Sequence, residues 1–509
     1  MSLPRPGIGT IIVVFLGTAW LASDGRQSQG NQDPLPTPVA NAAPEGVAAP
    51  TAKAYLVGVS GCSSYPCHGG QRRSAIAAVG SEYLYWSLYD PHARAYHVLE
   101  EETSLRMLSI LVGEMVGRFS EAPDSLQTLC LACHTTAGDL APAARGETVL
   151  ADGVSCESCH GPASGWLAAH TQRSWHGLRR AAAANGFVNT DRLNERAGQC
   201  ARCHVGDATH QVNHDMIAAG HPRLNFELSS FMARLPRHWD RDEQISGSIY
   251  GEPAHGQAYE AKAYLVGQCV AASYALKLLS SRIERELQRP GVAAAFMPGQ
   301  HVWPELSEYS CYACHRDLEA SSGIDDARAS RIPGPIGSLR WGSWYVHGLL
   351  DADGPLAFAA ADGGRWNSAV SELQQVREAM DRFYLPDEQL AAVAQQARQL
   401  AGEFDRLAVE LDTQFTTRVA DQAAVNALYD KVKLAVSQTL SWDDACQAYL
   451  ALRAINRSLD DMRAPRADAH RQQLRLLADE LRLKPELNSP QGKSAISLQE
   501  FFDASRDRR

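Results

Sequence analysis

The sequence predicts a mainly α-helical protein with little regular sheet, in which a cysteine-rich N-terminal part is followed by an antiparallel helical bundle. Three observations support this prediction. Ten of the twelve cysteines stand in short pairs, each followed directly by a histidine. Residues from about 258 to 288 read as one long helix with an apolar side. After Pro386, apolar residues recur at alternating spacings of three and four, which is the pattern of one helix face.

Length and charge limit the class of protein. A chain of 509 residues is long enough for two to four domains, and 45% hydrophobic with 21% charged residues is typical of a folded, water-soluble protein. The formal net charge of −10 argues against nucleic acid as a partner, because phosphate binding needs a basic surface.

The first residues look like a targeting segment. In residues 1–23, Arg5 precedes an apolar run that ends at Ala22 and Ser23, as in an export signal. The run is shorter than the ~20 residues that span a bilayer comfortably, which favours removal over a permanent anchor, although an uncleaved anchor stays open. Residues 24–53 are rich in Pro, Ala, Gly, Gln and Asn and read as a flexible linker. We therefore expect a periplasmic or otherwise exported protein, either released or tethered to the membrane.

The paired cysteines carry the chemistry. Four motifs have the spacing C-x-x-C-H, and the first is a C-x4-C-H variant. In order they are Cys62, Cys67 and His68; Cys130, Cys133 and His134; Cys156, Cys159 and His160; Cys200, Cys203 and His204; Cys311, Cys314 and His315.

C-x-x-C-H is the attachment pattern of c-type haem. Two sulfurs bond the two vinyl groups of the porphyrin, and the adjoining histidine reaches the iron. Random placement of these residue types would give about 0.01 such motifs in a chain of this composition. A structural zinc site would combine two pairs and would not require a histidine after each of them. We therefore expect five covalently attached haem c groups.

The first motif allows another interpretation. Its two extra residues can bulge outward around Pro66 while both sulfurs still reach the vinyl groups. The alternative is a disulfide between Cys62 and Cys67, with His68 incidental.

Each iron also needs a sixth ligand or an open face. Twelve further histidines are present, and all but His470 lie at or before His347, which favours bis-histidine over His/Met ligation. We single out five as candidate distal ligands, although each could instead be a surface histidine: His92, His170, His221, His301 and His347.

Two stretches resemble a known family. DPHARAYHVL ahead of CLACH, and DGVSCESCHGPASGWL, are similar to multihaem cytochromes that include hydroxylamine oxidoreductase and the tetrahaem cytochrome that accepts its electrons. The likeness covers about residues 55–350. It implies closely stacked haems in a helical wrapper and, in some members, one five-coordinate haem that handles nitrogen oxides or hydroxylamine. Only the attachment motifs and His92 carry over.

This sequence departs from that family in three ways. It has five motifs instead of four or eight, its first motif is C-x4-C-H, and a long haem-free tail follows. The C-x-x-C-K motif typical of pentahaem nitrite reductases is absent, which argues against nitrite reduction to ammonia.

The pattern divides the chain into a pentahaem cytochrome c domain at 54–350 and a haem-free helical bundle at 360–509. The long helix at about 258–288 has Cys269 on its apolar side. Cys269 and Cys446 read as small buried hydrophobes; a reactive thiol, or a disulfide between them, stays open. In the bundle, a capping box at Ser441 and Asp444 marks one helix start. The apolar residues that recur after Pro386 form one stripe of seven residues along a predicted helix: Leu390, Val393, Ala397, Leu400, Phe404, Leu407 and Leu411.

The expected function is electron transport by closely spaced haems. Two other classes stay open: an oxidoreductase with one open-face haem that acts on a small nitrogen or sulfur compound, and a structural subunit of a respiratory complex. The expected partners are redox proteins or a membrane-bound respiratory complex, and the bundle could form a homo-oligomer contact.

Overall fold

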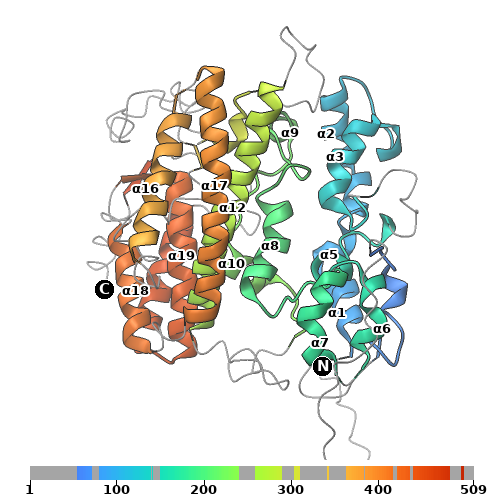
Figure 1. Cartoon of the computed structure of the whole chain (residues 1–509), viewed down its shortest axis with the longest axis horizontal. Helices are drawn as coiled ribbons and strands as arrows, with labels where there is room; N and C mark the ends of the chain where they lie inside the picture. The colour runs from blue at the N-terminus through green and yellow to red at the C-terminus, as the bar shows by residue number, and fades with distance from the viewer. Residues whose placement is uncertain are drawn as a thin grey trace, which may run out of the picture. The chain divides into compact units, whose positions relative to one another are not determined.

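Short α-helices make up most of the described N-terminal half, and three of them end at a cysteine motif (Figure 1). The computed structural model describes residues 54–70, 80–138, 140, 150–172, 174–239, 258–288, 303–309, 341–342, 363–382, 385–415, 421–435, 439–481 and 495–497. The α-helices of this half are α1 Glu82–Tyr89, α2 Glu102–Val112, α3 Asp124–His134, α5 Cys156–His160, α6 Leu167–His170, α7 Trp175–Ala182, α8 Leu193–His204, α9 His214–Ala219 and α10 Leu228–Arg234.

Short 3-10 turns connect these helices. α8 and α10 join a large apolar core with α12 (Tyr259–Leu287), whereas the other clusters between these helices are small. The turns are η1 Val59–Gly61, η2 Pro91–Arg94, η3 His97–Glu100, η4 Phe119–Glu121, η6 Ala163–Gly165, η7 Ala183–Asn185 and η8 Leu306–Glu308. One cluster forms where α2 packs on α9, and it contains Leu108 and Met216. A second contains Trp166 and Trp175.

The predicted long helix is confirmed. α12 spans Tyr259–Leu287 and is buried on nearly all sides. It packs against α8 on one side and against α17 and α19 on others. Cys269 is a fully buried free thiol, so no disulfide joins it to Cys446, which is itself buried.

The C-terminal helices form the predicted bundle and run side by side in Figure 1. α17 begins directly after Pro386, and every residue of the predicted stripe is buried. Ser441 immediately precedes α19, but the side chains of Ser441 and Asp444 lie outside the described residues. The bundle helices are α16 Gly363–Met380, α17 Asp387–Gln414, α18 Gln422–Ala435, α19 Trp442–Asp461 and α20 Ala467–Glu480.

The mainly α fold with little sheet is thus confirmed. The described residues contain one small antiparallel ladder, in which β1 (Thr439–Ser441) pairs with β2 (Ala495–Ser497). Within the same residues, no helix has both the length and the apolar character of a membrane span.

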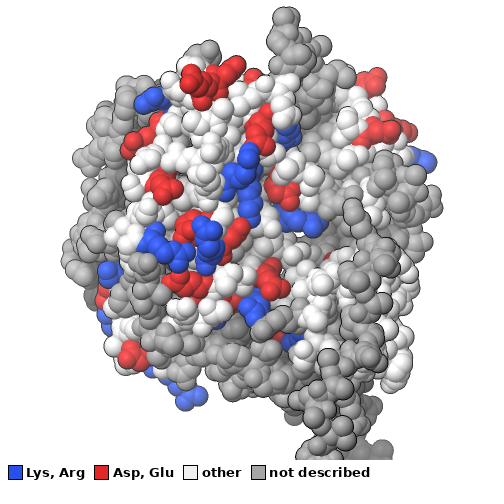
Figure 2. All heavy atoms as spheres, viewed as in Figure 1, with Lys and Arg blue, Asp and Glu red and all other residues white. Residues whose placement is uncertain are grey.

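Two buried ion pairs join α12 to its surroundings. Lys262 Nζ lies 2.9 Å from Asp412 Oδ1 of α17, and both side chains are only 5% exposed. Arg282 binds Glu308 of η8, and both side chains are buried. Surface ion pairs such as Arg365 with Glu403 lie on α16 and α17, and on the face seen in Figure 2 the charges of opposite sign are interspersed.

Candidate haem sites

Three of the described motifs end an α-helix. α3 ends at His134, α5 at His160 and α8 at His204. Residues three apart lie on the same face of a helix, so C-x-x-C in these helices places both thiols on one side. The histidine then follows in the last turn. This local geometry is what attachment to two vinyl groups and one iron requires.

The first motif forms a turn instead of a helix. The Cys67 amide donates to the Ser64 carbonyl at 3.0 Å, and the Gly69 amide donates to the same carbonyl at 3.1 Å. Tyr65, inside the motif, is 75% exposed. The additional residues therefore bulge toward solvent, as predicted for a C-x4-C-H variant.

Each of these four motif histidines faces a second histidine from a distant part of the chain. The ring centroids are 6.1–6.4 Å apart in all four pairs. The pairs are His68 with His170 (6.3 Å, planes at 15°), His134 with His221 (6.4 Å, 83°), His160 with His238 (6.4 Å, 71°) and His204 with His92 (6.1 Å, 77°).

This separation fits an iron ion between the two rings. A metal–nitrogen bond is ~2.0 Å and a ring centre lies about 1.2 Å beyond its nitrogen, so two trans imidazoles place their centres ~6.3 Å apart. The same bonds at a tetrahedral zinc ion would bring the centres to about 5.2 Å. The four pairs therefore have the spacing of axial ligands on opposite faces of a haem.

Hydrogen bonds at Nδ1 orient most of these rings and leave Nε2 for a metal. His68 Nδ1 lies 2.9 Å from Glu82 Oε2, and His92 Nδ1 lies 2.9 Å from Asp90 Oδ1. Backbone carbonyls are the Nδ1 partners in three other cases: Ala95 for His134, Leu167 for His170 and Pro222 for His221. The His238 ring has a backbone hydrogen bond to Pro236.

Burial keeps the remaining two rings neutral. Loss of solvent lowers the pKa of His160 to about 4 and that of His204 to about 4. A neutral imidazole has the lone pair that binds a metal, so both side chains are in the ligating form at neutral pH.

Thiols of different motifs lie next to one another. Cys62 of the first motif lies close enough to Cys156 of the third to shift its pKa, and Cys133 of the second is related to Cys203 of the fourth in the same way. The third and fourth motifs are joined by packing of α5 on α8. In space the four motifs thus follow the order first, third, fourth, second.

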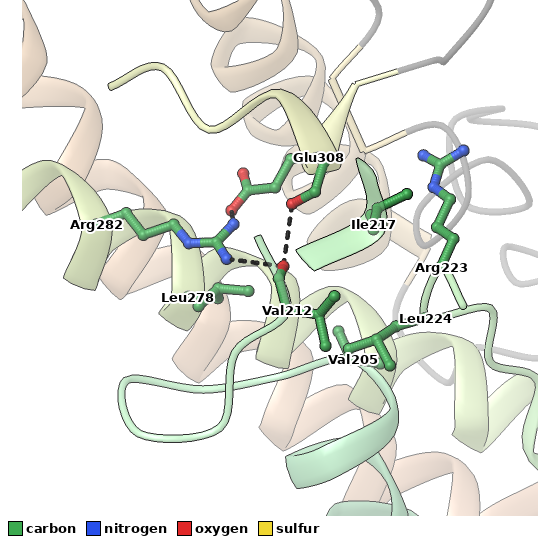
Figure 3. Close-up of a pocket in the computed structure, with 9 residues that line it drawn as sticks. Val205, Val212, Ile217, Arg223, Leu224, Leu278, Arg282 and Glu308 are labelled. Atoms are coloured by element: carbon green, nitrogen blue, oxygen red, sulfur yellow. Dashed lines mark hydrogen bonds and ion pairs between the residues drawn. The ribbon is translucent and has the colours of Figure 1, made fainter. Parts of the chain in front are cut away.

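The fifth motif is outside the described residues, together with the candidate ligands His301 and His347. The preceding residues, 303–309, are held by several contacts. Glu308 receives hydrogen bonds from Arg282 and from Trp341 Nε1, and Ser307 donates to the Val212 carbonyl at 3.2 Å (Figure 3). Arg223, two residues after His221, donates to the Tyr309 carbonyl at 3.0 Å. Tyr309, the last described residue before the fifth motif, is thus held beside the segment that carries His221.

Three of the candidate distal histidines are placed opposite a motif histidine: His92, His170 and His221. His238, which faces His160, was not among the predicted distal ligands. Proline was a usable signal, because His92 follows Pro91, His221 precedes Pro222 and His238 follows Pro236 by two residues. His97, also in the DPHARAYHVL stretch, is exposed at the surface.

Comparison with known proteins agrees with the geometry. Residues 62–161 match the family described as cytochrome c554 and c-prime. The matched segment contains the first three motifs, and the match supports a multihaem c-type cytochrome with covalently bound haem and a role in electron transfer. No curated protein and no solved structure matches the chain.

Proposed function

We propose that this protein is an exported pentahaem cytochrome that carries electrons through closely spaced, bis-histidine haems. The four histidine pairs at 6.1–6.4 Å carry the proposal. When histidine fills both axial positions, no coordination site is left for a substrate, and the haem exchanges electrons only. Haems are numbered one to five below, in the order of their motifs.

Three groups of residues would hold each haem, and each group has a different role. The cysteine pairs would tether each porphyrin, the paired imidazoles would ligate its iron, and the acceptors at Nδ1 fix the ring orientations. The bound haem supplies a one-electron couple between ferric and ferrous iron. The small apolar clusters between the N-terminal helices fit this role, because porphyrins would complete the interior of this half.

The contacts between motifs support a path. The Cys62–Cys156 and Cys133–Cys203 contacts, with α5 packed on α8, favour the order one, three, four, two. The Arg223–Tyr309 contact favours haem five next to haem two. Electrons would then enter or leave at haem one, whose motif is at the surface, and at haem five.

The same four histidine pairs limit which haem could be the active site of an enzyme. An open-face haem that acts on a small nitrogen or sulfur compound, as the resemblance to hydroxylamine oxidoreductase implies, would have to be haem five. We favour electron transfer for the four haems whose ligand pairs are described.

We also propose the partners that this role requires. They are redox proteins, free or in a membrane-bound respiratory complex, reached after export with the N-terminal segment either removed or kept as a tether. The seven stripe residues of α17 are buried inside the chain. A homo-oligomer contact through the bundle would therefore use other bundle surfaces.

Intact mass and carbon monoxide binding test this function. The exported protein is expected to have the mass of the polypeptide plus five haems, and in the reduced state haems one to four should not bind carbon monoxide. A mass with four haems would assign Cys62, Cys67 and His68 to another role. Carbon monoxide binding by more than one haem per chain would contradict the bis-histidine proposal.

A further inference from the structure

The hydrogen-bond partners of the axial histidines differ in charge from site to site. At haem one, His68 bonds the carboxylate of Glu82 at 2.9 Å. At haem four, His92 bonds the carboxylate of Asp90 at 2.9 Å. At haems two and three, the hydrogen-bond partners of His134, His221 and His238 are neutral backbone carbonyls; Glu82 and Asp90 act on His238 through their charge alone, without a hydrogen bond.

Both carboxylates are held in place. Glu82 begins α1, and both of its oxygens accept from the Gly80 amide at 2.9 Å. Asp90 precedes η2, where its Oδ1 also accepts from the His92 amide at 3.0 Å. The Asp90 side chain is only 7% exposed and that of Glu82 is 21% exposed, so water screens neither charge fully.

A carboxylate partner changes the electronic character of an axial imidazole. It attracts the Nδ1 proton, which makes the ring a stronger donor at Nε2, and it places a negative charge near the iron. Both effects stabilise ferric over ferrous iron and lower the reduction potential. A backbone carbonyl has neither the charge nor the same basicity.

We infer that Glu82 and Asp90 are positioning residues that hold haems one and four at lower reduction potentials than haems two and three. This inference rests on the proposed bis-histidine ligation. Along the order one, three, four, two, low and high potentials would alternate. During stepwise reduction, haems two and three would therefore receive electrons before haems one and four.

The test uses the full haem-loaded protein and the variants Glu82→Gln and Asp90→Asn. Each keeps the size of the side chain and an oxygen that can accept from Nδ1, but removes the charge. Redox titrations followed by electron paramagnetic resonance report the midpoint of each ferric signal. Haem one should be identifiable, because its imidazole planes lie at 15° whereas those of the other three described pairs lie at 71–83°.

Asp152→Asn is the matched control. Its carboxylate accepts from the Val59 amide at 3.3 Å, close to the first motif, and bonds no axial histidine. We expect Glu82→Gln to raise the midpoint of haem one and Asp90→Asn to raise that of haem four, each by more than the control raises any midpoint. In the double variant both shifts should be present.

Two results would overturn the inference. One is an unchanged midpoint in a variant that retains its full haem mass and its low-spin signals. The other is an equal shift in Asp152→Asn, which would attribute the effect to charge alone. Failure of the bis-histidine proposal itself would be seen separately, as high-spin signals from these haems in the unsubstituted protein.

Discussion

His238 is the residue whose removal tests a single ligand pair most cleanly. Its ring lies 6.4 Å from that of His160, and no other described motif histidine faces it. We expect His238→Ala to leave haem three covalently attached but without its sixth ligand. Ferric absorption spectra should then show one haem converted from low to high spin, and the reduced protein should bind one additional carbon monoxide.

His97→Ala is the control for that change. His97 is exposed, and the ring contact recorded for it is with its neighbour Tyr96. Its replacement should leave every haem low-spin. A low-spin haem three in His238→Ala would show that another side chain is its ligand.

A single carboxylate of the third motif holds the segment that precedes the first motif. Glu157 is 5% exposed, and its oxygens accept from the amides of Val57 at 3.0 Å, Gly58 at 2.8 Å and Ala163 at 2.7 Å. In Glu157→Gln, an amide group would face these donors, so stability should fall by about 1–3 kcal/mol. Chemical denaturation of the haem-loaded protein measures this loss, and a change below about 0.5 kcal/mol would contradict the role assigned to Glu157.

Sequence could locate the ligating residue types but not their pairing. The motif histidines follow from local spacing, because the cysteines and the histidine must meet one porphyrin. The distal histidines come from positions far along the chain, and tertiary packing decides which ring meets which. For that reason His92 could be singled out and yet not be assigned to His204. His238 lies far from any motif and was distinguishable only by its proline.

At the scale of helices, α12 and α17 are joined by a buried and a half-exposed ion pair. Lys262 and Asp412 are each 5% exposed, whereas Lys277 and Asp405 are 41% and 46% exposed at a similar distance. Lys262→Met should cost about 3–5 kcal/mol, since it leaves Asp412 buried without its partner. Lys277→Met should cost ~1 kcal/mol or less, because water screens this pair.

A second substitution tests the physical reason for that difference. Adding Asp412→Leu to Lys262→Met removes the uncompensated charge, and most of the lost stability should return. Urea denaturation of the three variants measures all of these changes. Equal losses for Lys262→Met and Lys277→Met would show that burial does not determine the strength of these pairs.

The helices themselves were the most predictable elements. The stripe after Pro386 gave the start and the buried face of α17, because helical periodicity and a proline are local signals. The helix predicted at about 258–288 matches α12 almost to its ends, but the burial of α12 on nearly all sides depends on α8, α17 and α19. The β1–β2 pairing joins residues more than fifty positions apart and has no local signal.

In the whole molecule, the described buried apolar residues form two kinds of interior, one large core and several small clusters. One large apolar core runs from α8 through α12 into the bundle. The N-terminal helices other than α8 and α10 share only small clusters. Of the four histidine pairs, the one that contains His204 borders the large core through Phe226. The bundle folds on side-chain packing, whereas the N-terminal half is expected to need haem to complete its interior.

Ferric electron paramagnetic resonance of the purified protein tests the central claim most directly. Parallel imidazole planes separate the energies of two iron d orbitals, whereas perpendicular planes leave them nearly equal and give a highly anisotropic signal. The pairs at 15°, 71°, 77° and 83° therefore predict one rhombic and three highly anisotropic low-spin signals from haems one to four. High-spin signals from more than one haem per chain, or no haem signal, would contradict iron held between these histidine pairs.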